Sequence, residues 1–354
     1  MLDKDISVNL QHAIEDAVSS KNKLCIAAGN TKYFYGRTPI GDVLDVSEHS
    51  GVVNYEPTEL VITVRAGTKL TELEALLAEQ NQMLAFGPPN FGGSATIGGT
   101  VACNFSGPSR PFAGAVRDHV LGCRLINGKA QVLRFGGEVM KNVAGYDVSR
   151  LMCGAMGTLG VLLDVSLRVV PKPEETVTVV IEMSAEDALV RMHRIGLKAH
   201  PVSATCFDGE RLYVRLSGAA GAVKAARQTV GGDALHDGDA FWLKVKEQQH
   251  AFFQSEYPLW RLSLPSNAPV FDIAGKTFYE WSGAQRWLSS DVSSAVIRGT
   301  AAEFGGHATQ FKNHLNRNDV FHPLAPGIEK LHRNLKNAFD PEGVFNPGRM
   351  YSTF

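Results

Sequence analysis

Residues 92–108 read GGSATIGGTVACNFSGP, with five glycines among small residues and no acidic or basic side chain. Glycine has the largest conformational entropy to lose on folding. A cluster of glycines therefore indicates backbone that must adopt positive φ or approach another group closely. Both a surface loop and a backbone cradle around a phosphate or a flat cofactor fit this stretch.

The chain has 354 residues, which is enough for two domains. Hydrophobic residues make up 44% and charged residues 20%, as is typical of a globular protein. The net charge of −1 predicts no general attraction to nucleic acid or to anionic membranes. No apolar run approaches the roughly 20 residues of a membrane span, and the first residues do not resemble a signal peptide. We therefore expect a cytoplasmic protein.

Five cysteines are scattered along the chain, and none belongs to a CxxC pair. We expect no metal site and no iron–sulfur cluster held by this chain alone. An odd, unpaired set fits a reducing compartment, where the thiols act as small apolar residues.

The pattern of elements predicts an α+β protein with a boundary at VPKPEE, residues 170–175. Before it, Thr68 and the Thr71–Glu74 spacing predict the capped start of a helix over 68–81. After it come a strand over 176–183, a helix capped by Ser184, two further strands and a second helix. This β-α-β-β-α order indicates a small ferredoxin-like unit.

Common nucleotide and hydrolase fingerprints are absent from the sequence. There is no GxGxxG after a strand, no GxxxxGK[ST], no GxSxG and no HExxH. The sequence does contain four separated glycine-containing segments: AAGNTK (27–32), GPPNFGGSATIGG (87–99), RPFAGAVRDHVLG (110–122) and GGEVMKNVAGYDVSRLMCGAMGTLGVL (136–162).

These segments, together with WRLSLP, GGHATQF and FDPEGVFNPGRMY, resemble the flavoprotein superfamily with a PCMH-type (vanillyl-alcohol-oxidase) FAD-binding domain. Within it they are most similar to the FAD-binding E subunits of bacterial glycolate oxidases (glycolate dehydrogenases). The resemblance covers nearly the whole chain. It implies a PCMH-type FAD-binding domain of two α+β subdomains plus a small ferredoxin-like cap. The expected division is 1–173 for the FAD domain, 174–290 for the cap, and 291–354 for a segment that returns to the FAD domain.

The resemblance also implies which residues bind FAD. Those expected at the pyrophosphate are Gly29, Asn30, Thr31 and Lys32. Those expected beside the pyrophosphate and ribityl chain are Pro88, Ser94, Thr96, Ile97, Gly98 and Gly99, with main-chain N–H groups of the glycines reaching the dinucleotide. Those expected near the flavin are Asn104, Gly107 and Arg117. Those expected at the adenine half are Gly157, Thr158, Gly160 and Val161. The remaining expected FAD-site residues are Lys141, Asn142, Asn346 and Arg349.

Two features depart from the pattern of the relatives. The first pyrophosphate turn contains no histidine, so FAD is expected to bind without a covalent link. The HxGDGNxH-like run of relatives that oxidise 2-hydroxy acids is also missing. Oxidation of such an acid needs a base, a cation for the carboxylate and the flavin as hydride acceptor. The candidates for these catalytic roles are His307, Arg261 and Arg286, although a structural histidine and cation–π-packed arginines fit them equally well.

Three functions follow as hypotheses. The first is an FAD-binding subunit of a glycolate oxidase complex that oxidises glycolate to glyoxylate. Its implied partners are a larger FAD-binding subunit, which would carry out the substrate oxidation, and an iron–sulfur subunit that takes up the electrons. Any membrane association would be made through that complex. The second is a stand-alone FAD-dependent 2-hydroxy-acid dehydrogenase with His307 as base. The third is a non-catalytic assembly subunit with a vestigial flavin pocket.

Overall fold

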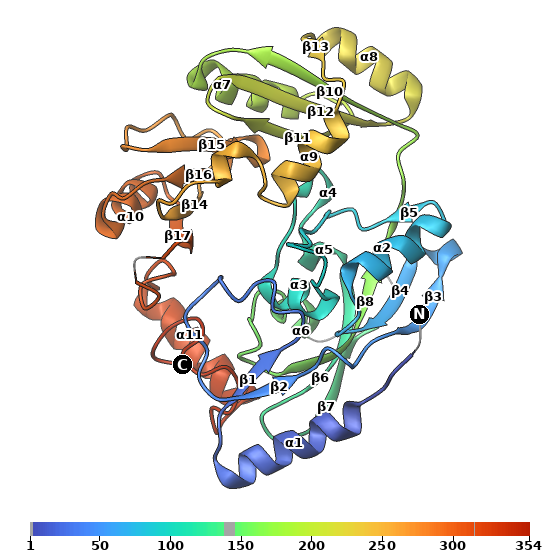
Figure 1. Ribbon diagram of the computed structural model, residues 1–354, viewed down its shortest axis with the longest axis vertical. Coiled ribbons are helices and arrows are strands. Elements are labelled where there is room, and N and C mark those ends of the chain that lie inside the picture. Colours follow the sequence, from blue (N-terminus) through green and yellow to red (C-terminus); the bar gives the residue numbers. More distant parts are fainter. Residues whose placement is uncertain (1–2, 138–145, 315) are drawn as a thin grey trace. The chain divides into compact units, whose positions relative to one another are not determined.

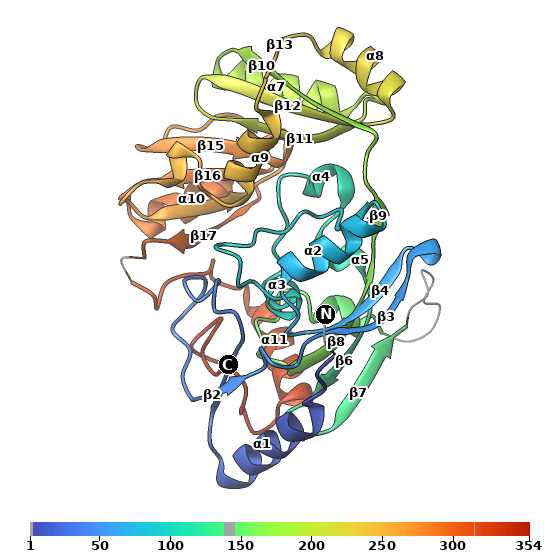
Figure 2. The same cartoon turned by 45° about the vertical axis from the view of Figure 1, so that its right-hand side comes forward.

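The computed structural model describes residues 3–137, 146–314 and 316–354. Contacts divide the chain into two compact units. The first is formed by residues 1–105, 115–171 and 323–354, and the second by residues 106–114 and 172–322. Both units mix helices and strands (Figures 1 and 2), so the fold is α+β as expected.

The first unit contains one five-stranded sheet, two two-stranded sheets and the helices packed on them. Its helices are α1 (Ser7–Ser20), η1 (Pro57–Glu59), α2 (Leu70–Glu79), α3 (Ile97–Cys103), α5 (Val116–His119), α6 (Val148–Leu151) and α11 (Pro326–Phe339). Its strands are β1 (Leu24–Ala27), β2 (Asp42–Asp45), β3 (Val52–Glu56), β4 (Val61–Arg65), β5 (Gln82–Met83), β6 (Val120–Ile126), β7 (Val132–Gly136), β8 (Val161–Arg168) and β9 (Val170–Pro171). An antiparallel sheet has the order β3-β4-β8-β6-β7, whereas β1 and β2 form a separate parallel pair and β5 pairs with β9.

Apolar spacing explains how the helices of the first unit pack. Leu70, Leu73 and Leu77 recur at helical spacing on α2, are fully buried, and belong to the same core cluster as apolar residues of β4 and β8. On α1, Leu10 and Ile14 belong to a second cluster with β1 and β2. A bridge between Leu24 and Phe345 also joins β1 to the C-terminal segment, which Figure 1 shows in red.

The second unit is built on one eight-stranded sheet. Its helices are α4 (Arg110–Ala113), α7 (Ala185–Gly196), α8 (Ala220–Val230), α9 (Gly238–Lys246), η2 (Ala251–Phe253), η3 (Trp281–Gly283) and α10 (Ser294–Glu303). Its strands are β10 (Glu175–Glu182), β11 (Val202–Phe207), β12 (Arg211–Gly218), β13 (Asp233–Ala234), β14 (Leu259–Ser263), β15 (Lys276–Glu280), β16 (Gln285–Ser289) and β17 (His307–Lys312). The strand order is β13-β10-β12-β11-β15-β16-β14-β17. The β10-α7-β11-β12-α8-β13 half is the ferredoxin-like arrangement expected from the sequence, and β15, β16, β14 and β17 extend its sheet.

The two faces of this sheet differ. One face packs against α7, α8 and α10 through Met192, Val223 and Ile297, and we call it the helix face. On the opposite face, α9 and η2 contribute an aromatic cluster, in which Phe241 stacks on Tyr213 at a centroid distance of 4.1 Å. Side chains alternate between the faces along each strand, so strand register decides which residues share a face.

Three expectations from the sequence are corrected by the fold. The boundary at residue 290 is wrong for α10 and β17, because β17 pairs with β14 and belongs to the second unit. Residues 106–114, expected in the FAD domain, also belong to the second unit. The Thr68 cap is wrong because its hydroxyl is bound to the backbone of Gly51, and α2 begins at Leu70. The Ser184 cap of α7 is confirmed by a hydrogen bond from the Asp187 N–H (3.2 Å).

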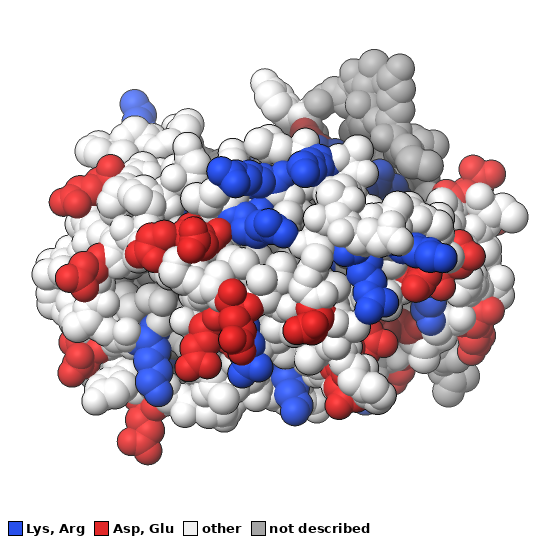
Figure 3. All heavy atoms as spheres, turned by 90° about the horizontal axis from the view of Figure 1, so that it is seen from above, with Lys and Arg blue, Asp and Glu red and all other residues white. Residues whose placement is uncertain are grey.

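Charge is mixed across the surface shown in Figure 3, where basic and acidic side chains both occur and neither covers the face. This agrees with the net charge of −1. Within the described part of the chain, no helix has the length and apolar character needed to cross a lipid bilayer.

Candidate functional site

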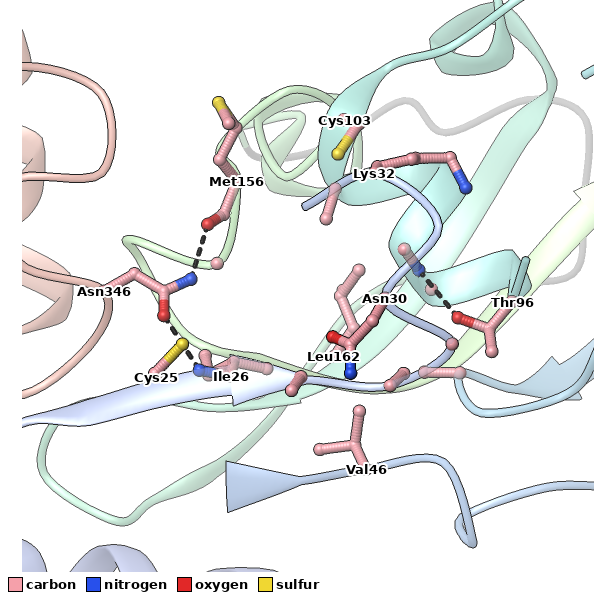
Figure 4. Close-up of a pocket in the computed structure, with 18 of the residues that line it drawn as sticks. Cys25, Ile26, Asn30, Lys32, Val46, Thr96, Cys103, Met156, Leu162 and Asn346 are labelled. Atoms are coloured by element: carbon pink, nitrogen blue, oxygen red, sulfur yellow. Dashed lines mark hydrogen bonds between the residues drawn. The ribbon is translucent and has the colours of Figure 1, made fainter. Parts of the chain in front are cut away.

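A pocket in the first unit brings together four segments that are far apart in the sequence (Figure 4). The space inside it, together with the open solvent at its mouth, is about 1250 Å³. Its lining residues are Cys25, Ile26, Ala27, Ala28, Gly29, Asn30, Thr31, Lys32, Tyr33, Pro39, Val43, Val46, Ala66, Thr96, Gly98, Gly99, Ala102, Cys103, Met152, Ala155, Met156, Gly157, Gly160, Leu162, Asn346 and Arg349.

The turn after β1 supplies the polar end of the pocket. Asn30 has a φ of 53°, and within the described chain the backbone N–H groups of Asn30 and Thr31 donate to no protein acceptor. Lys32 is buried, with its Nζ 3.3 Å from Thr31 Oγ1. Amide donors beside an ammonium group fit the diphosphate of a dinucleotide. The turn itself requires Gly29, because a Cβ there would lie 1.7 Å from the carbonyl oxygen of Ser94.

Gly98 and Gly99 of the 92–108 stretch serve packing more than ligand donation. The N–H of Gly98 donates to the Ala66 carbonyl (2.8 Å), and a Cβ on Gly98 would lie 2.6 Å from the Ala66 Cβ. The N–H of Gly99 donates to Thr96 Oγ1 (3.2 Å), a bond drawn in Figure 4. The expectation that these two N–H groups reach the dinucleotide is therefore corrected. The glycines let α3 approach the end of β4 and keep this wall of the pocket flat.

The C-terminal turn closes another side of the pocket. Asn346 Oδ1 accepts a hydrogen bond from the Ile26 N–H (2.8 Å), and its Nδ2 donates to the Met156 carbonyl (2.7 Å), as Figure 4 shows. The Arg349 guanidinium donates to the carbonyls of Tyr35 (2.6 Å) and Arg37. Both side chains thus fix the segments that line the pocket.

The remaining wall is apolar. Val43 is 70% exposed although it lies on the lining, and Val46 and Leu162 flank the same space. A large apolar side chain exposed on the wall of a pocket is suited to cover an aromatic ring system of a ligand. The apolar wall and the polar turn together fit FAD.

The structure brings about half of the sequence-predicted residues to this pocket. Those on the lining are Gly29, Asn30, Thr31, Lys32, Thr96, Gly98, Gly99, Gly157, Gly160, Asn346 and Arg349. Those in the described chain but not on the lining are Pro88, Ser94, Ile97, Asn104, Gly107, Arg117, Thr158 and Val161. Lys141 and Asn142 lie outside the described residues.

Burial in the core, a place in the second unit, a local hydrogen bond or surface exposure explains why most of these residues do not line the pocket. Ile97 and Val161 are fully buried in the core, and Gly107 belongs to the second unit. Thr158 donates its hydroxyl to the Ala155 carbonyl (2.7 Å). Arg117 is at the surface, 3.9 Å from Asp118.

Sequence reasoning missed the apolar lining residues. Cys25, Ile26 and Val43 lie on or beside strands, where the sequence shows only ordinary apolar strand residues. Cys25 and Ile26 could have been found because they directly precede the Gly29 turn, whereas Val43, on the next strand, has no such signal.

The three catalytic candidates lie in the second unit, and the structure contradicts the role of Arg286. Arg286 is fully buried on the helix face, between the rings of Tyr279 (5.1 Å) and Phe271 (5.4 Å). Its guanidinium donates to the carbonyls of Gly283 (3.1 Å), Pro269 (2.6 Å) and Ala268. It stabilises the fold and is not open to a substrate carboxylate.

Arg261 and His307 lie on the opposite face of the sheet. The ladder pairs Ser263 with His307 and Arg261 with Thr309, which places these four side chains on the same face. His307 is exposed, and its ring centroid is 6.3 Å from that of His322. Partial burial, Arg261 and His322 all lower the pKa of His307, so its imidazole is neutral near pH 7.

Comparison with known proteins gives first the class and then the family. Residues 8–136 match the family model described as "FAD binding domain", so FAD is the cofactor and the chain is a flavoprotein. The chain is 46% identical to glycolate oxidase subunit GlcE of Escherichia coli (strain K12), over 98% of both chains. It belongs to the family of FAD-binding glycolate oxidase E subunits, and it is an FAD-dependent oxidoreductase acting on CH–OH donors.

Other relatives match over part of their length. Glycolate oxidase subunit GlcD of Bacillus subtilis (strain 168) is 33% identical over 38% of this chain and 28% of its own. D-lactate dehydrogenase of Anaerostipes hadrus is 30% identical over 40% of this chain and 29% of its own. A solved structure of alkyldihydroxyacetonephosphate synthase superposes with a TM-score of 0.68 at 14% identity, covering 96% of this chain and 74% of that one. This likeness shows the PCMH-type fold.

Proposed function

We propose that this chain is the FAD-binding subunit of a multi-subunit glycolate oxidase, which oxidises glycolate to glyoxylate and passes the electrons to an iron–sulfur partner. The observation that carries the proposal is the 46% identity to a glycolate oxidase E subunit over 98% of both chains. The intact pocket in the first unit, with its donor turn at 29–32, supports a subunit that retains its flavin.

In this proposal, different pocket residues bind different parts of FAD. The N–H groups of Asn30 and Thr31 and the ammonium group of Lys32 bind the diphosphate, and Val43 packs against an aromatic ring of the cofactor. When bound, FAD supplies the two-electron acceptor for oxidation of a C–H bond.

The substrate contacts are proposed on the second unit. In the alternative of a stand-alone dehydrogenase, Arg261 would bind the substrate carboxylate through its planar guanidinium and His307, on the same face, would accept the proton. A larger FAD-binding subunit completes the complex, as the division of glycolate oxidase into D and E subunits among the relatives supports.

The test is an anaerobic absorbance spectrum of the purified chain with FAD, before and after addition of glycolate, alone and with partner subunits. We expect flavin bands that persist with glycolate until the partners are added. Bands that bleach in the isolated chain would indicate a stand-alone dehydrogenase instead. The absence of flavin bands even after addition of FAD would overturn the cofactor assignment and favour an assembly role.

A further inference from the structure

A second pocket lies on the second unit, on the face of its sheet opposite the helices. Phe253 of η2, Ser255 and Tyr257 of the loop that follows η2, Leu259 of β14 and Lys312 of β17 are on its lining. All of its lining residues belong to the second unit. The pocket is therefore complete within one compact unit, and its chemistry can be argued from that unit alone.

A β-bulge directs Lys312 into this pocket. Gln310 pairs with Trp260 of β14, and the Trp260 side chain is packed on the helix face. Lys312, two positions later, pairs with Leu259, so Phe311 is an extra residue in β17. Without this extra residue, Lys312 would lie on the helix face, as Gln310 does. Bulges change the direction of a side chain in this way and are common beside functional sites.

Hydrogen bonds fix the loop that forms one wall of the pocket. Asn313, with a φ of 53°, donates from Nδ2 to the carbonyls of Ser255 (2.7 Å) and Tyr257 (3.2 Å). The Ser255 hydroxyl accepts from the Tyr257 N–H (3.2 Å) and from the Ser289 hydroxyl of β16 (2.8 Å). The residue next to Lys312 thus holds the loop against the strand that carries the amine.

Burial changes the chemistry of the Lys312 amine. Its side chain is partly buried, and this lowers its pKa from 10.5 to about 8. At pH 7.5 about a quarter of such amines are uncharged, against about one in a thousand for an ordinary lysine. Only the uncharged amine has the lone pair that attacks a carbonyl carbon, so a desolvated lysine is suited to form a Schiff base.

The other titratable and charged groups around the pocket were compared with Lys312 by the chemistry they offer. Glu256 and Tyr257 also line the pocket, and both are exposed. Lys276 of β15 pairs with Ser289 and is exposed at the far end of that row. The remaining groups on neighbouring elements are His250, Arg261 and His314. Of the described residues that line the pocket, Lys312 alone carries an amine side chain.

We propose that Lys312 is a binding site for a small aldehyde, which its Nζ captures as a reversible Schiff base. The aldehyde expected here is glyoxylate, the product of the oxidation proposed above, so the choice of ligand rests on the proposed function. Nζ attacks the carbonyl carbon and a C–N bond forms. The C–O bond then breaks, and the oxygen leaves as water with the two hydrogens of the amine. Neither partner is oxidised or reduced, and hydrolysis reverses the reaction.

The experiment labels the full chain loaded with FAD. The protein is incubated with glyoxylate and sodium cyanoborohydride, which reduces a Schiff base to a stable secondary amine, and peptide mass spectrometry measures the label on each lysine. At pH 7.5 we expect Lys312 to be labelled at least about 10-fold faster than Lys224, an exposed lysine of α8. This preference should shrink above about pH 9, where ordinary lysines also begin to lose their protons.

A pair of variants controls for unspecific labelling. Lys312→Arg keeps the positive charge but has no primary amine, so the fast label should disappear from the peptide. Lys224→Arg, the matched control, should keep the fast label at Lys312. Thermal melts with glyoxylate alone give a second readout, in which the wild type and Lys224→Arg should gain stability and Lys312→Arg should not.

The outcomes separate this inference from the proposed function. Labelling of Lys312 that is no faster than that of Lys224, or an equal gain of stability in Lys312→Arg, would overturn the inference and leave the proposed function intact. An assembled complex whose flavin is not reduced by glycolate would overturn the proposed function, and with it glyoxylate as the ligand. Fast labelling of Lys312 in that protein would still establish the aldehyde site.

Discussion

One buried carboxyl group in each unit shows two different ways of burying a titratable side chain. In the first unit, the ammonium group of Lys336 and the carboxylate of Asp340 are both buried and lie 2.6 Å apart. Lys336 also donates to the carbonyls of Thr158 and Phe345, both at 2.8 Å. In the second unit, Glu280 is as deeply buried, but its two donors are an indole and an amide, neither of them charged.

This difference distinguishes a buried carboxyl group that stabilises the fold from one that can take part in proton transfer. A buried carboxylate that faces a cation is held in its ionised form, and its role is to fix the segments that surround it. A buried carboxyl group with only neutral donors titrates in the neutral range and can exchange a proton with a ligand. A buried charged residue alone therefore does not indicate function, whereas the nature of its partners does.

Removing the cation of the buried Lys336–Asp340 pair should have the largest effect on stability. Lys336→Met leaves Asp340 buried without its cation and removes two further hydrogen bonds from the C-terminal segment. We expect a loss of about 3–5 kcal/mol in the free energy of unfolding. Urea denaturation followed by circular dichroism measures it. The control, Lys330→Met on the exposed side of the same helix, should change little, and equal losses in the two variants would contradict the comparison.

Replacing Glu280, the buried carboxyl group without a cationic partner, by a neutral residue should stabilise the protein at high pH. The pKa of Glu280 is raised by burial from 4.5 to about 7, so the native state holds the proton more tightly than the unfolded state. The contribution of this group to the free energy of unfolding is fully present below about pH 4.5. It is lost as the pH rises from there through about 7, by up to about 3 kcal/mol. Glu280→Gln should remove this slope. Unfolding midpoints at pH 5 and pH 8 measure it, and a slope that survives the substitution would show that another group causes it.

A half-exposed ion pair should contribute least. Partial burial raises the pKa of Asp5, but hydrogen bonding to Ser7 and the charge of Arg65 together outweigh it and lower this pKa to about 2. A lowered pKa contributes stability above about pH 4 that is lost as the pH falls towards 2. Asp5→Asn should therefore cost about 0.2–1 kcal/mol at pH 7 and flatten the acid limb of the stability curve. Thermal melts between pH 2 and pH 7 provide the measurement, and a loss as large as that of Lys336→Met would contradict the ranking.

Local sequence signals predicted the parts of the fold that local chemistry determines. The ferredoxin-like half of the second unit followed from the order of its strands and helices, and Ser184 caps its helix through a hydrogen bond between near neighbours. The turn at 29–32 was found because glycine and asparagine mark a tight backbone close to the end of a strand. At Thr68 the same capping pattern failed, because the hydroxyl has a better partner in Gly51, 17 residues away.

The positions of the other site residues depend on strand register, which cannot be read from the sequence. Arg261 and Arg286 both stand beside aromatic residues on neighbouring strands, and only the pairing of Leu262 with Arg286 shows that they point to opposite faces. Glu280 has no local signature, since its burial comes from strands that pair with β15 from both sides. The apolar lining residues of the pocket were missed for the same reason.

The anchoring of Asn346 to Ile26 has a consequence for how the flavoprotein is made. The two residues are 320 positions apart, yet their hydrogen bond joins two walls of the same pocket. A ribosome delivers the first wall early and the second only after nearly all of the chain seen here has been translated. The complete pocket can form only after that moment, so a chain that stops before its C-terminal turn would lack one wall of the pocket.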